Sequence, residues 1–233
     1  MLSSSELPCV IVTHNAPMPP ALATACKKNA VPLMRSALDT ATLTGELSEA
    51  LEARLAPATT VHGVLVDVYG LGVLIQGEAG IGKSECALEL LKRGHILVAD
   101  DAVQVQHRRG GVLRGSCPEP LRNHMEVRGL GIIDVKLLFG IGAILDRTRI
   151  ELAIKLEPWN AAAMIDRTGL EQRKLSILEV EVPLIRIPVS PGRNLAVLIE
   201  VASLNQRLRS QGYFSAETFN KRLIERMKSK ERA

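Results

Sequence analysis

Short apolar runs and amphipathic segments alternate along the first 55 residues of the chain. The pattern predicts strands over residues 8–14 and 31–36 and helices over residues 19–30 and 45–55. The tract "APATT" that follows is a predicted linker. Two strands and two helices of this size bury little surface alone. We therefore expect residues 1–57, a partial N-terminal α/β domain, to pack against the rest of the chain or against another subunit.

Residues 58–233 are predicted to form a second domain that is richer in strands. The stretch "VHGVLVDVYGLGVLI" consists of two β-rich runs divided at Tyr69-Gly70, which predicts a hairpin and therefore a mixed sheet. A helix-like run ends near Leu91. Further strands are predicted in "ILVAD", "AVQVQ", "IELAIKL" and "EVEVPLIRIPV", with "HRRGG" as a turn. Helical spacing then covers "NLAVLIEVASLNQRLRSQ" and "SAETFNKRLIERMK", with Ser215 as the N-cap of the second helix. The predicted fold class is α/β with a mixed central sheet and C-terminal helices.

The apolar content of 46% allows a sizeable core but no membrane span. The longest apolar runs, such as residues 137–145, fall far short of the roughly 20 residues that cross a bilayer. The first residues lack the basic segment and the long apolar run of a secretory signal. We therefore predict a cytoplasmic protein with no membrane partner.

Cysteine spacing and charge exclude two further classes. Cys9, Cys26, Cys86 and Cys117 include no C-x-x-C pair, which argues against a zinc site or a disulfide framework and favours reduced, buried thiols. The net charge of +4 lies in residues 221–233, which hold six Lys or Arg and two Glu. Because the chain has only two Tyr, three Phe and one Trp to stack on bases, we interpret this segment as a solvated helix end and expect no nucleic-acid partner.

A glycine-rich loop between a predicted strand and a predicted helix carries the main chemical signal. The residues Gly77, Gly82, Lys83 and Ser84 fit G-x-x-x-x-G-K-[ST], in which backbone N–H groups and a helix N-terminus hold phosphates. In such a loop the lysine reaches the β- and γ-phosphates and the hydroxyl binds Mg²⁺. The predicted nucleotide-binding residues are Gly77, Glu78, Ala79, Gly80, Ile81, Gly82, Lys83 and Ser84. An ordinary glycine turn is the alternative.

Two carboxylates follow the next strand. Only a short helix fits between Ser84 and the run "ILVADD", so Asp100 and Asp101 are expected beside the glycine-rich loop. One carboxylate there can support Mg²⁺ and the other can accept a proton. Paired Asp residues also end strands simply as turn formers, so this interpretation competes with a structural one. The base-reading motif N-K-x-D and the signature L-S-G-G-Q are absent, and the pattern alone therefore indicates a phosphate-binding α/β enzyme of the kinase type.

Three more stretches give the chain a family resemblance. They are "VHGVLVDVYGLGVLI", "MEVRGLGIIDV" (residues 125–135) and "PVSPGRNLAVLIEVA" (residues 188–202). Together with "GEAGIGKSE" and "ADDAV", and in this order, they closely resemble the bacterial HPr kinase/phosphorylase family from about Pro8 to the C-terminus. The resemblance implies a P-loop kinase core similar to that of phosphoenolpyruvate carboxykinase. It also implies a homohexamer that phosphorylates a serine of the carrier protein HPr with ATP or pyrophosphate, with Mg²⁺ as cofactor, and that removes the phosphate by phosphorolysis.

The same resemblance implies roles for particular residues. The implied catalytic residues are His62, Lys83, Asp101 and Arg167, and the implied Mg²⁺ ligands are Ser84 and Glu126. The signature segment, implied to serve both directions, is Met125, Glu126, Val127, Arg128, Gly129, Leu130, Gly131, Ile132, Ile133 and Asp134. The 188–193 loop, implied to serve phosphorolysis, is Pro188, Val189, Ser190, Pro191, Gly192 and Arg193. Proton chemistry is compatible with these roles, because one carboxylate can take the serine proton in the forward direction and return it in the reverse. Arg193 and the following helix N-terminus would form a second anion site.

Structural interpretations exist for several of these residues. Without the resemblance, His62 would be assigned a structural role in its strand, Glu126 and Arg128 a surface ion pair, and the "DRTG" tract around Arg167 a plain turn. Ala79 stands where family loops often carry Ser, with little expected loss because backbone N–H groups do most of the phosphate binding. The chain also matches only about the second half of the family's N-terminal domain, which predicts a shortened domain.

Two other functions remain compatible with the motifs. One is a P-loop kinase that acts on a small molecule, and the other is a nucleotide-sensing regulator without turnover. Transfer of phosphate to purified HPr separates the family activity from both.

Overall fold

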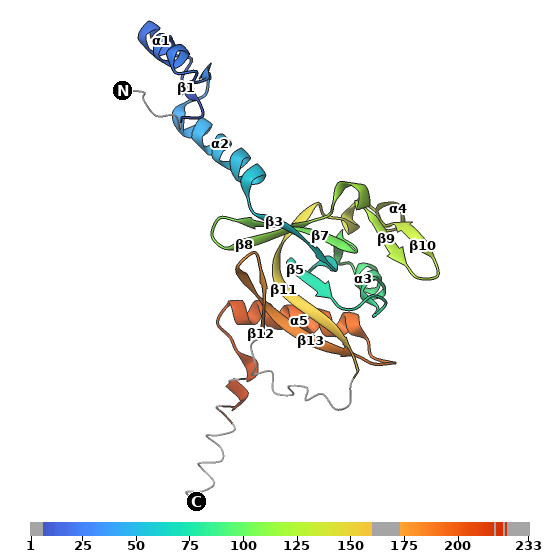
Figure 1. Cartoon of the computed structure of the whole chain (residues 1–233). Coiled ribbons are helices and arrows are strands. Elements are labelled where there is room, and N and C mark those ends of the chain that lie inside the picture. The colour runs from blue at the N-terminus through green and yellow to red at the C-terminus, as the bar shows by residue number, and fades with distance from the viewer. Residues whose placement is uncertain (1–6, 160–172, 217, 221, 223–233) are drawn as a thin grey trace, which may run out of the picture. The chain divides into compact units, whose positions relative to one another are not determined.

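The computed structural model describes residues 7–159, 173–216, 218–220 and 222 (Figure 1). The chain divides into two units, Met1–Ala56 and Pro57–Ala233. The predicted helix over residues 215–228 lies largely outside the described residues, as does Arg167.

The first unit consists of two short strands and two helices. β1 (Val10–Val12) pairs in parallel with β2 (Leu33–Arg35), and α1 (Pro20–Lys28) connects them. α2 (Thr40–Leu55) begins earlier than predicted because Asp39 caps it: its carboxylate accepts hydrogen bonds from the Thr42 backbone N–H at 2.9 Å and from the Thr42 hydroxyl at 2.6 Å. The sequence pattern therefore placed all four elements and missed the N-cap.

Nine strands form one mixed sheet within the described part of the second unit. One path through it runs β3-β7-β8-β11-β5-β4-β6, and β13 pairs with both β11 and β12. β9 (His124–Val127) and β10 (Gly131–Asp134) form a separate hairpin. The nine strands are β3 (Ala58–His62), β4 (Val64–Val68), β5 (Leu71–Gln76), β6 (Ile96–Ala99), β7 (Ala102–Arg108), β8 (Val112–Ser116), β11 (Arg147–Pro158), β12 (Arg173–Ile177) and β13 (Val180–Val189). The mixed sheet and the β4–β5 hairpin confirm the prediction. β8 and β12 were not predicted, and β3 includes residues 58–60 of the tract that was predicted as a linker.

β11 organises the end of the sheet that carries the chemistry. It pairs in parallel with β5, with Lys155 opposite Gln76, and in parallel with β13, with Pro158 opposite Val189. The carboxyl ends of β5, β11 and β13 therefore point toward the same edge of the sheet. The glycine-rich loop leaves that edge after β5, and the 188–193 loop leaves it after β13.

Two helices cover one face of this sheet. α3 (Lys83–Lys92) follows the glycine-rich loop and α5 (Leu195–Ser210) follows the 188–193 loop. Both contribute to a single apolar core, in which Leu90 of α3 and Ile199 of α5 are fully buried. Each such side chain contributes roughly 1.5–3 kcal/mol through burial. The two helices that begin at the two loops are thus packed into one core.

The opposite face of the central strands is buried as well. Leu65 and Leu74, on β4 and β5, belong to a second core with Val105 of β7, Leu113 of β8 and Val182 of β13. Burial on both faces explains why the β4 and β5 sequences are almost continuously apolar rather than alternating.

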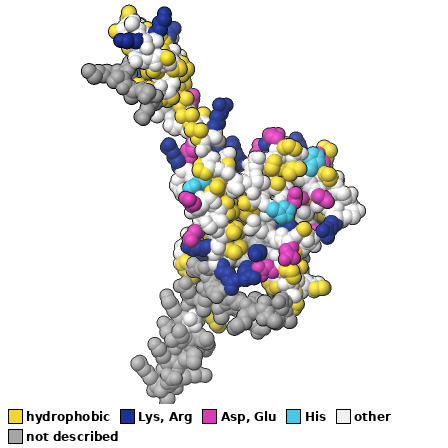
Figure 2. All heavy atoms as spheres, in the orientation of Figure 1, with side chains coloured by type: hydrophobic (Ala, Val, Ile, Leu, Met, Phe, Trp, Pro, Cys, Tyr) yellow, Lys and Arg dark blue, Asp and Glu magenta, His cyan; other side chains and the backbone are white. Residues whose placement is uncertain are grey.

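Short elements complete the described chain. They are the 3-10 turns Glu119–Leu121 and Ile141–Ala143, and α4 (Val135–Phe139). α4 follows the β9–β10 hairpin, and Leu137, Leu138 and Ile141 there are strongly exposed. Figure 2 shows hydrophobic side chains on the surface in this part of the molecule.

The state of the four cysteines agrees with the prediction of reduced, buried thiols. Cys26, Cys86 and Cys117 are buried, Cys9 is partly buried, and all four are free thiols. Burial, followed by the nearby charges of Glu89 and Glu85, raises the pKa of Cys86 to about 12. Among the described residues, no helix is long and apolar enough to cross a membrane.

Candidate functional site

The glycine-rich loop turns the chain sharply from β5 into α3. A Cβ atom at Gly77 would lie 2.8 Å from the Leu156 carbonyl oxygen of β11 and 2.9 Å from the Ile81 side chain, so a larger residue does not fit there. Gly82 is the N-cap of α3 and has a φ of 100° in the left-handed region, which favours glycine. Glycine is therefore required at the two positions for different reasons: Gly77 packs closely on β11, and Gly82 makes the turn into α3.

Lys83 points back into the loop that precedes it. The residue is only 8% exposed, and its Nζ donates hydrogen bonds to the carbonyl oxygens of Gly77 and Glu78, each at 3.0 Å. The ammonium group thus lies at the loop that leads into α3. A buried positive charge beside a helix N-terminus forms an electrostatic environment for an anion.

Asp100 connects three segments that are far apart in the sequence. Its Oδ1 accepts a hydrogen bond from the Ser84 hydroxyl at 2.9 Å, and its Oδ2 accepts one from the Glu126 backbone N–H at 3.1 Å. The residue is 4% exposed, and burial raises the pKa of its carboxyl group, although the bonds from Glu126 and Ser84 act in the opposite direction. Asp100 thereby ties α3 to β9.

Asp101 and His62 form an exposed pair. The antiparallel register of β3 and β7 places His62 opposite Ala102, and the His62 Nδ1 lies 3.1 Å from the Asp101 Oδ1. Asp101 has a φ of 66°, and its side chain is 68% exposed against 56% for His62. A carboxylate in this position is accessible to a large reaction partner, while the imidazole can orient it.

The signature segment divides between core and surface. Met125 and Val127 are buried in the core, whereas Glu126 on the same strand is exposed, as the period of a strand requires. The Arg128 guanidinium group lies against the glycine-rich loop, so that a Cβ at Gly80 would be only 2.5 Å from its NH1. The segment thus contacts the loop through one side chain and supports it through its core residues.

The rest of the signature segment forms the hairpin tip and the entry to α4. Leu130 and Ile132 are 72% and 75% exposed, and Asp134 caps α4 by accepting a hydrogen bond from the Leu137 backbone N–H at 2.9 Å. Gly129, Gly131 and Ile133 complete the segment.

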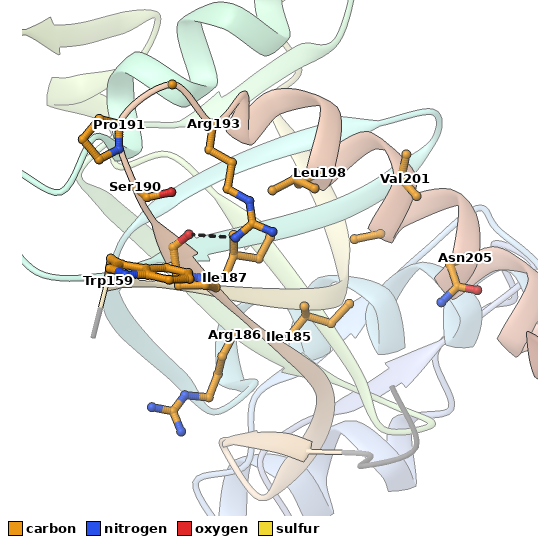
Figure 3. A pocket seen from close by; sticks show the side chains of 13 residues that line it. Trp159, Ile185, Arg186, Ile187, Ser190, Pro191, Arg193, Leu198, Val201 and Asn205 are labelled. Carbon is orange, nitrogen blue, oxygen red and sulfur yellow. Dashed lines mark hydrogen bonds between the residues drawn. The ribbon is translucent and has the colours of Figure 1, made fainter. Parts of the chain in front are cut away.

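A cavity of about 870 Å³ lies beside the 188–193 loop, between β13 and α5 (Figure 3). Arg193 extends from the loop, and its NH1 donates a weak hydrogen bond to the Pro188 carbonyl oxygen at 3.5 Å. The indole of Trp159, at the end of β11, lines the same cavity, with Ser190 on the loop and Asn205 on α5.

The N-terminus of α5 is capped internally. The Asn194 Oδ1 accepts a hydrogen bond from the Val197 backbone N–H at 3.1 Å, so this N–H group is already engaged. The Arg193 side chain is exposed and remains available as part of the predicted second anion site.

Oxygen donors suited to Mg²⁺ gather around Asp100. Within the described residues, no group of three or more His, Cys, Asp or Glu side chains could hold a metal ion. Mg²⁺, however, is usually held by one or two carboxylates together with substrate phosphates and water. The Ser84 hydroxyl and the Asp100 carboxylate satisfy that chemistry, and Glu126, whose backbone N–H contacts Asp100, carries a further carboxylate, so these residue types fit Mg²⁺.

The structure places most of the predicted residues at one end of the sheet, but several contacts were not foreseen. Ser84, Asp100 and Glu126 are linked by hydrogen bonds, and His62 is paired with Asp101. For the His62–Asp101 pair, the only sequence signal is that His62 ends one strand, β3, and Asp101 precedes another, β7. The contact of Arg128 with the loop and the position of Trp159 beside the 188–193 loop had no local sequence signal.

These features together define a mixed α/β protein with a lysine-bearing glycine-rich loop, a carboxylate bridge at its base and a second loop on the same sheet edge. Sequence comparison gives the family. The profile of the HPr Serine kinase C-terminal domain matches residues 53–223, and that of the HPr Serine kinase N terminus matches residues 1–51. The chain therefore belongs to the HPr serine kinase family, which confirms the resemblance inferred from its motifs.

Individual relatives agree with this assignment. The HPr kinase/phosphorylase of Geobacillus thermodenitrificans is 51% identical over 231 residues, covering 99% of this chain and 75% of the relative. That of Brevibacillus brevis is 49% identical over 221 residues, covering 95% of this chain and 71% of the relative. The solved structure of the Hpr(Ser) kinase/phosphatase from Coxiella burnetii is 40% identical, with a TM-score of 0.62, and it covers 69% of this chain and 98% of that chain.

Proposed function

We propose that this protein is a bifunctional serine kinase/phosphorylase of the carrier protein HPr. It would transfer phosphate from ATP or pyrophosphate to a serine of HPr, and it would return that phosphate to inorganic phosphate to give pyrophosphate. The observation that carries the proposal is the pair of hydrogen bonds that Asp100 accepts from Ser84 and Glu126. Because Asp101 follows Asp100 directly, the exposed His62–Asp101 pair lies next to the base of the glycine-rich loop. The names of the relatives supply the acceptor protein.

In the forward direction, Asp101 acts as the general base. Its carboxylate accepts the proton of the HPr serine hydroxyl while the serine oxygen attacks the terminal phosphorus of the donor, and the bond to the leaving phosphate oxygen breaks. Lys83 stabilises the charge of the transferring group, and the N–H groups at the start of α3 hold its oxygens. His62, 3.1 Å from Asp101, orients the carboxylate.

In the reverse direction, the same residues exchange roles. A phosphate oxygen attacks the phosphorus of phosphoserine, the bond between the serine oxygen and phosphorus breaks, and protonated Asp101 donates its proton to the serine oxygen. Microscopic reversibility requires the group that acts as a base in one direction to act as an acid in the other. The exposure of Asp101 suits this role, because the reacting serine belongs to another protein.

The 188–193 loop would position the incoming phosphate. Arg193 offers a planar cation with several donors, which matches the geometry of phosphate oxygens. Since the loop leaves the same sheet edge as the glycine-rich loop, the two phosphates of the product pyrophosphate would be approached from the ends of β5 and β13, the two parallel partners of β11.

Ser84 and Glu126 would hold Mg²⁺, with Asp100 as their link. The ion, when bound, neutralises negative charge on the phosphates that approach each other. Asp100 orients the Ser84 hydroxyl through the 2.9 Å hydrogen bond, and its bond to the Glu126 backbone fixes the start of the signature segment. Arg167, which lies outside the described residues, completes the proposed catalytic set.

The finer features of the family are included in the proposal. They are a P-loop core similar to that of phosphoenolpyruvate carboxykinase, a cytoplasmic location and a homohexamer. The exposed apolar residues of α4 and the β9–β10 hairpin favour assembly, because monomers rarely leave so many large apolar side chains in contact with water.

The direct test is mass spectrometry of intact HPr. Purified HPr is incubated with the protein and Mg²⁺, with either ATP or pyrophosphate, and a mass increase of one phosphate is expected. Phosphorylated HPr incubated with inorganic phosphate should lose that mass and give pyrophosphate. EDTA should abolish both reactions.

Two outcomes would contradict the proposal. Phosphate transfer to a small molecule but never to HPr would indicate a small-molecule kinase. Nucleotide binding with no transfer to any acceptor would indicate a sensor without turnover.

A further inference from the structure

A mostly buried carboxylate on α5, that of Glu200, joins this helix to the end of α3. The Glu200 side chain is 13% exposed, and its Oε1 lies 3.0 Å from the Nε2 of His95, whose side chain is 3% exposed. The Glu200 Oε2 accepts a hydrogen bond from the Arg93 NH1 at 3.3 Å. Arg93 is the C-cap of α3, and His95 follows it by two residues.

The turn between β4 and β5 completes the cluster. The Tyr69 hydroxyl donates a hydrogen bond to the Glu200 Oε1 at 3.3 Å, and its ring packs edge-on against the His95 ring with centroids 4.6 Å apart. About two turns further along α5, the Arg207 NH1 donates to the Tyr69 carbonyl oxygen at 3.0 Å. α5 is therefore fixed at two points along its length, and Glu200 is the point that reaches α3.

The contacts of Glu200 with Arg93 and His95 are costly to break. Glu200 is mostly removed from water and depends on its donors for compensation, so removing the carboxylate leaves the buried His95 imidazole without this partner. On the other side of the cluster, Arg93 also donates through its Nε to Glu89 at 3.1 Å, which holds the guanidinium group on α3. The cluster thus resists sliding of one helix along the other.

The two helices carry the two loops of the proposed active site. α3 begins at Lys83, immediately after the glycine-rich loop, and α5 begins directly after the 188–193 loop. Both preceding strands are parallel to β11, so the loops share one sheet edge. A shift of α5 against α3 would therefore change the separation between Lys83 and Arg193.

We infer that Glu200 is a positioning residue for phosphorolysis, which sets the distance between the two phosphate-holding loops by locking α5 to the end of α3. The inference rests on the proposed function and extends it, because only the reverse reaction needs an incoming phosphate placed against the glycine-rich loop. The forward reaction from ATP relies on the glycine-rich loop, which β11 also supports.

The experiment compares Glu200→Ala with wild type in both directions on HPr and phosphorylated HPr, with inorganic phosphate as the varied substrate. The KM for phosphate in phosphorolysis should rise on the order of 10-fold, because small displacements of a positioned group have effects of that size or larger. The KM for ATP and the kinase kcat should stay within about 2-fold. Ser203→Ala is the matched control, since Ser203 is also buried on α5 but its hydroxyl donates within the helix, to the Ile199 carbonyl oxygen. It should leave both directions unchanged.

Two further variants separate positioning from folding. Glu200→Gln keeps the side-chain volume if Glu200→Ala does not fold, and it should raise the KM for phosphate in the same direction by a smaller factor. The double variant Glu200→Leu with His95→Leu replaces both buried partners by apolar groups, which can preserve stability, and it should restore the melting temperature more than it restores the KM for phosphate.

Each outcome decides the inference. An equal fall of kcat in both directions with an unchanged KM for phosphate would mean that Glu200 only stabilises the fold. Unaltered kinetics of both Glu200→Ala and Glu200→Gln would also overturn the inference while leaving the proposed function intact. A wild-type protein that is inert toward HPr in both directions would overturn the proposed function, and this inference with it.

Discussion

The guanidinium group of Arg128 lies over Gly80, so close that a Cβ atom at residue 80 would be 2.5 Å from its NH1 and 2.6 Å from its NH2. This contact joins the signature segment to the glycine-rich loop. Gly80 also has a φ of 79°, which a residue with a side chain rarely adopts.

Gly80→Ala is therefore expected to displace Arg128 and to raise the KM for ATP several-fold in the kinase reaction. The backbone strain alone should lower the free energy of unfolding by about 1 kcal/mol. Gly110→Ala is the matched control, because Gly110 has a φ of 77° but a Cβ atom added there would meet nothing within 4 Å. Kinetics and denaturant unfolding of both variants check the prediction, and equal kinetic effects would refute a role for the Arg128 contact.

Lys83→Ala should abolish both directions. In the proposed mechanism both reactions pass through the same transferring phosphoryl group, whose charge the Lys83 ammonium group would stabilise. Initial rates of kinase and phosphorylase are measured with HPr and phosphorylated HPr. Retention of either rate above about a tenth of wild type, far more than the loss of such a charge allows, would contradict a shared site.

Asp101→Asn should remove both activities while nucleotide binding survives. The amide keeps the shape of the side chain but cannot carry the proton, and general acid–base catalysis supplies about 10²- to 10⁴-fold in rate. Asp146→Asn, at an exposed carboxylate with a weak contact to Arg122, is the control and should be fully active. A near-normal kinase rate of Asp101→Asn would transfer the role of the base to Asp100.

Arg193→Ala should slow phosphorolysis more than phosphorylation from ATP, because turnover of ATP needs no incoming phosphate to be positioned. Losing a charge-assisted contact to phosphate worth about 1.5–3 kcal/mol predicts a fall of roughly 10- to 100-fold in the reverse rate, with partial recovery at high phosphate. Arg186→Ala tests whether any cation at this cavity has the same effect, because Arg186 lines it too but is paired with Glu157 through its Nε at 2.7 Å. Equal losses in both directions for Arg193→Ala would assign Arg193 to HPr docking or to the fold.

The raised pKa of Asp100 predicts a pH dependence of stability. Burial makes the Asp100 carboxyl group bind its proton more tightly in the folded state than in the unfolded state. Protonation of Asp100 therefore contributes fully to the free energy of unfolding below the unfolded pKa near 3.8, and this contribution is lost as the pH rises through the folded pKa. Asp100→Asn does not ionise, so its free energy of unfolding should gain on that of wild type as the pH rises above the unfolded pKa near 3.8 and through the raised folded pKa. The gain amounts to roughly 1.4 kcal/mol for each unit of pKa difference.

Urea unfolding in EDTA measures this difference without a metal contribution. Asp134→Asn, the cap of α4, serves as the control for loss of a carboxylate that only caps a helix. A constant difference between Asp100→Asn and wild type across this pH range would contradict the prediction.

The sequence predicted those parts of the fold that are encoded locally. The β4–β5 hairpin follows from two apolar runs divided at Tyr69-Gly70, and the glycine-rich loop follows from a spacing that few other structures require. β8 and β12 were missed because their short sequences, "VLRGS" and "RKLSI", alternate weakly and contain charged residues that face solvent.

The pairs that assemble the site could not be predicted in the same way. His62 and Asp101 meet only because β3 and β7 pair in antiparallel register, and Glu200 meets His95 only because α3 and α5 share one core. Such contacts depend on the topology of the whole sheet. The family resemblance could point to His62 and Asp101 individually, but it could not supply the 3.1 Å relation between them.

The two hydrogen bonds from Lys83 to the Gly77 and Glu78 carbonyl oxygens make the loop selective by charge. An incoming anion must compete with two uncharged acceptors for the same ammonium group, and the strength of a charged hydrogen bond grows with the charge of its acceptor. A weakly charged anion gains little from this exchange, whereas a polyphosphate gains several strong bonds at once. We therefore expect the loop to favour polyphosphates over singly charged anions, whatever else the phosphates are attached to.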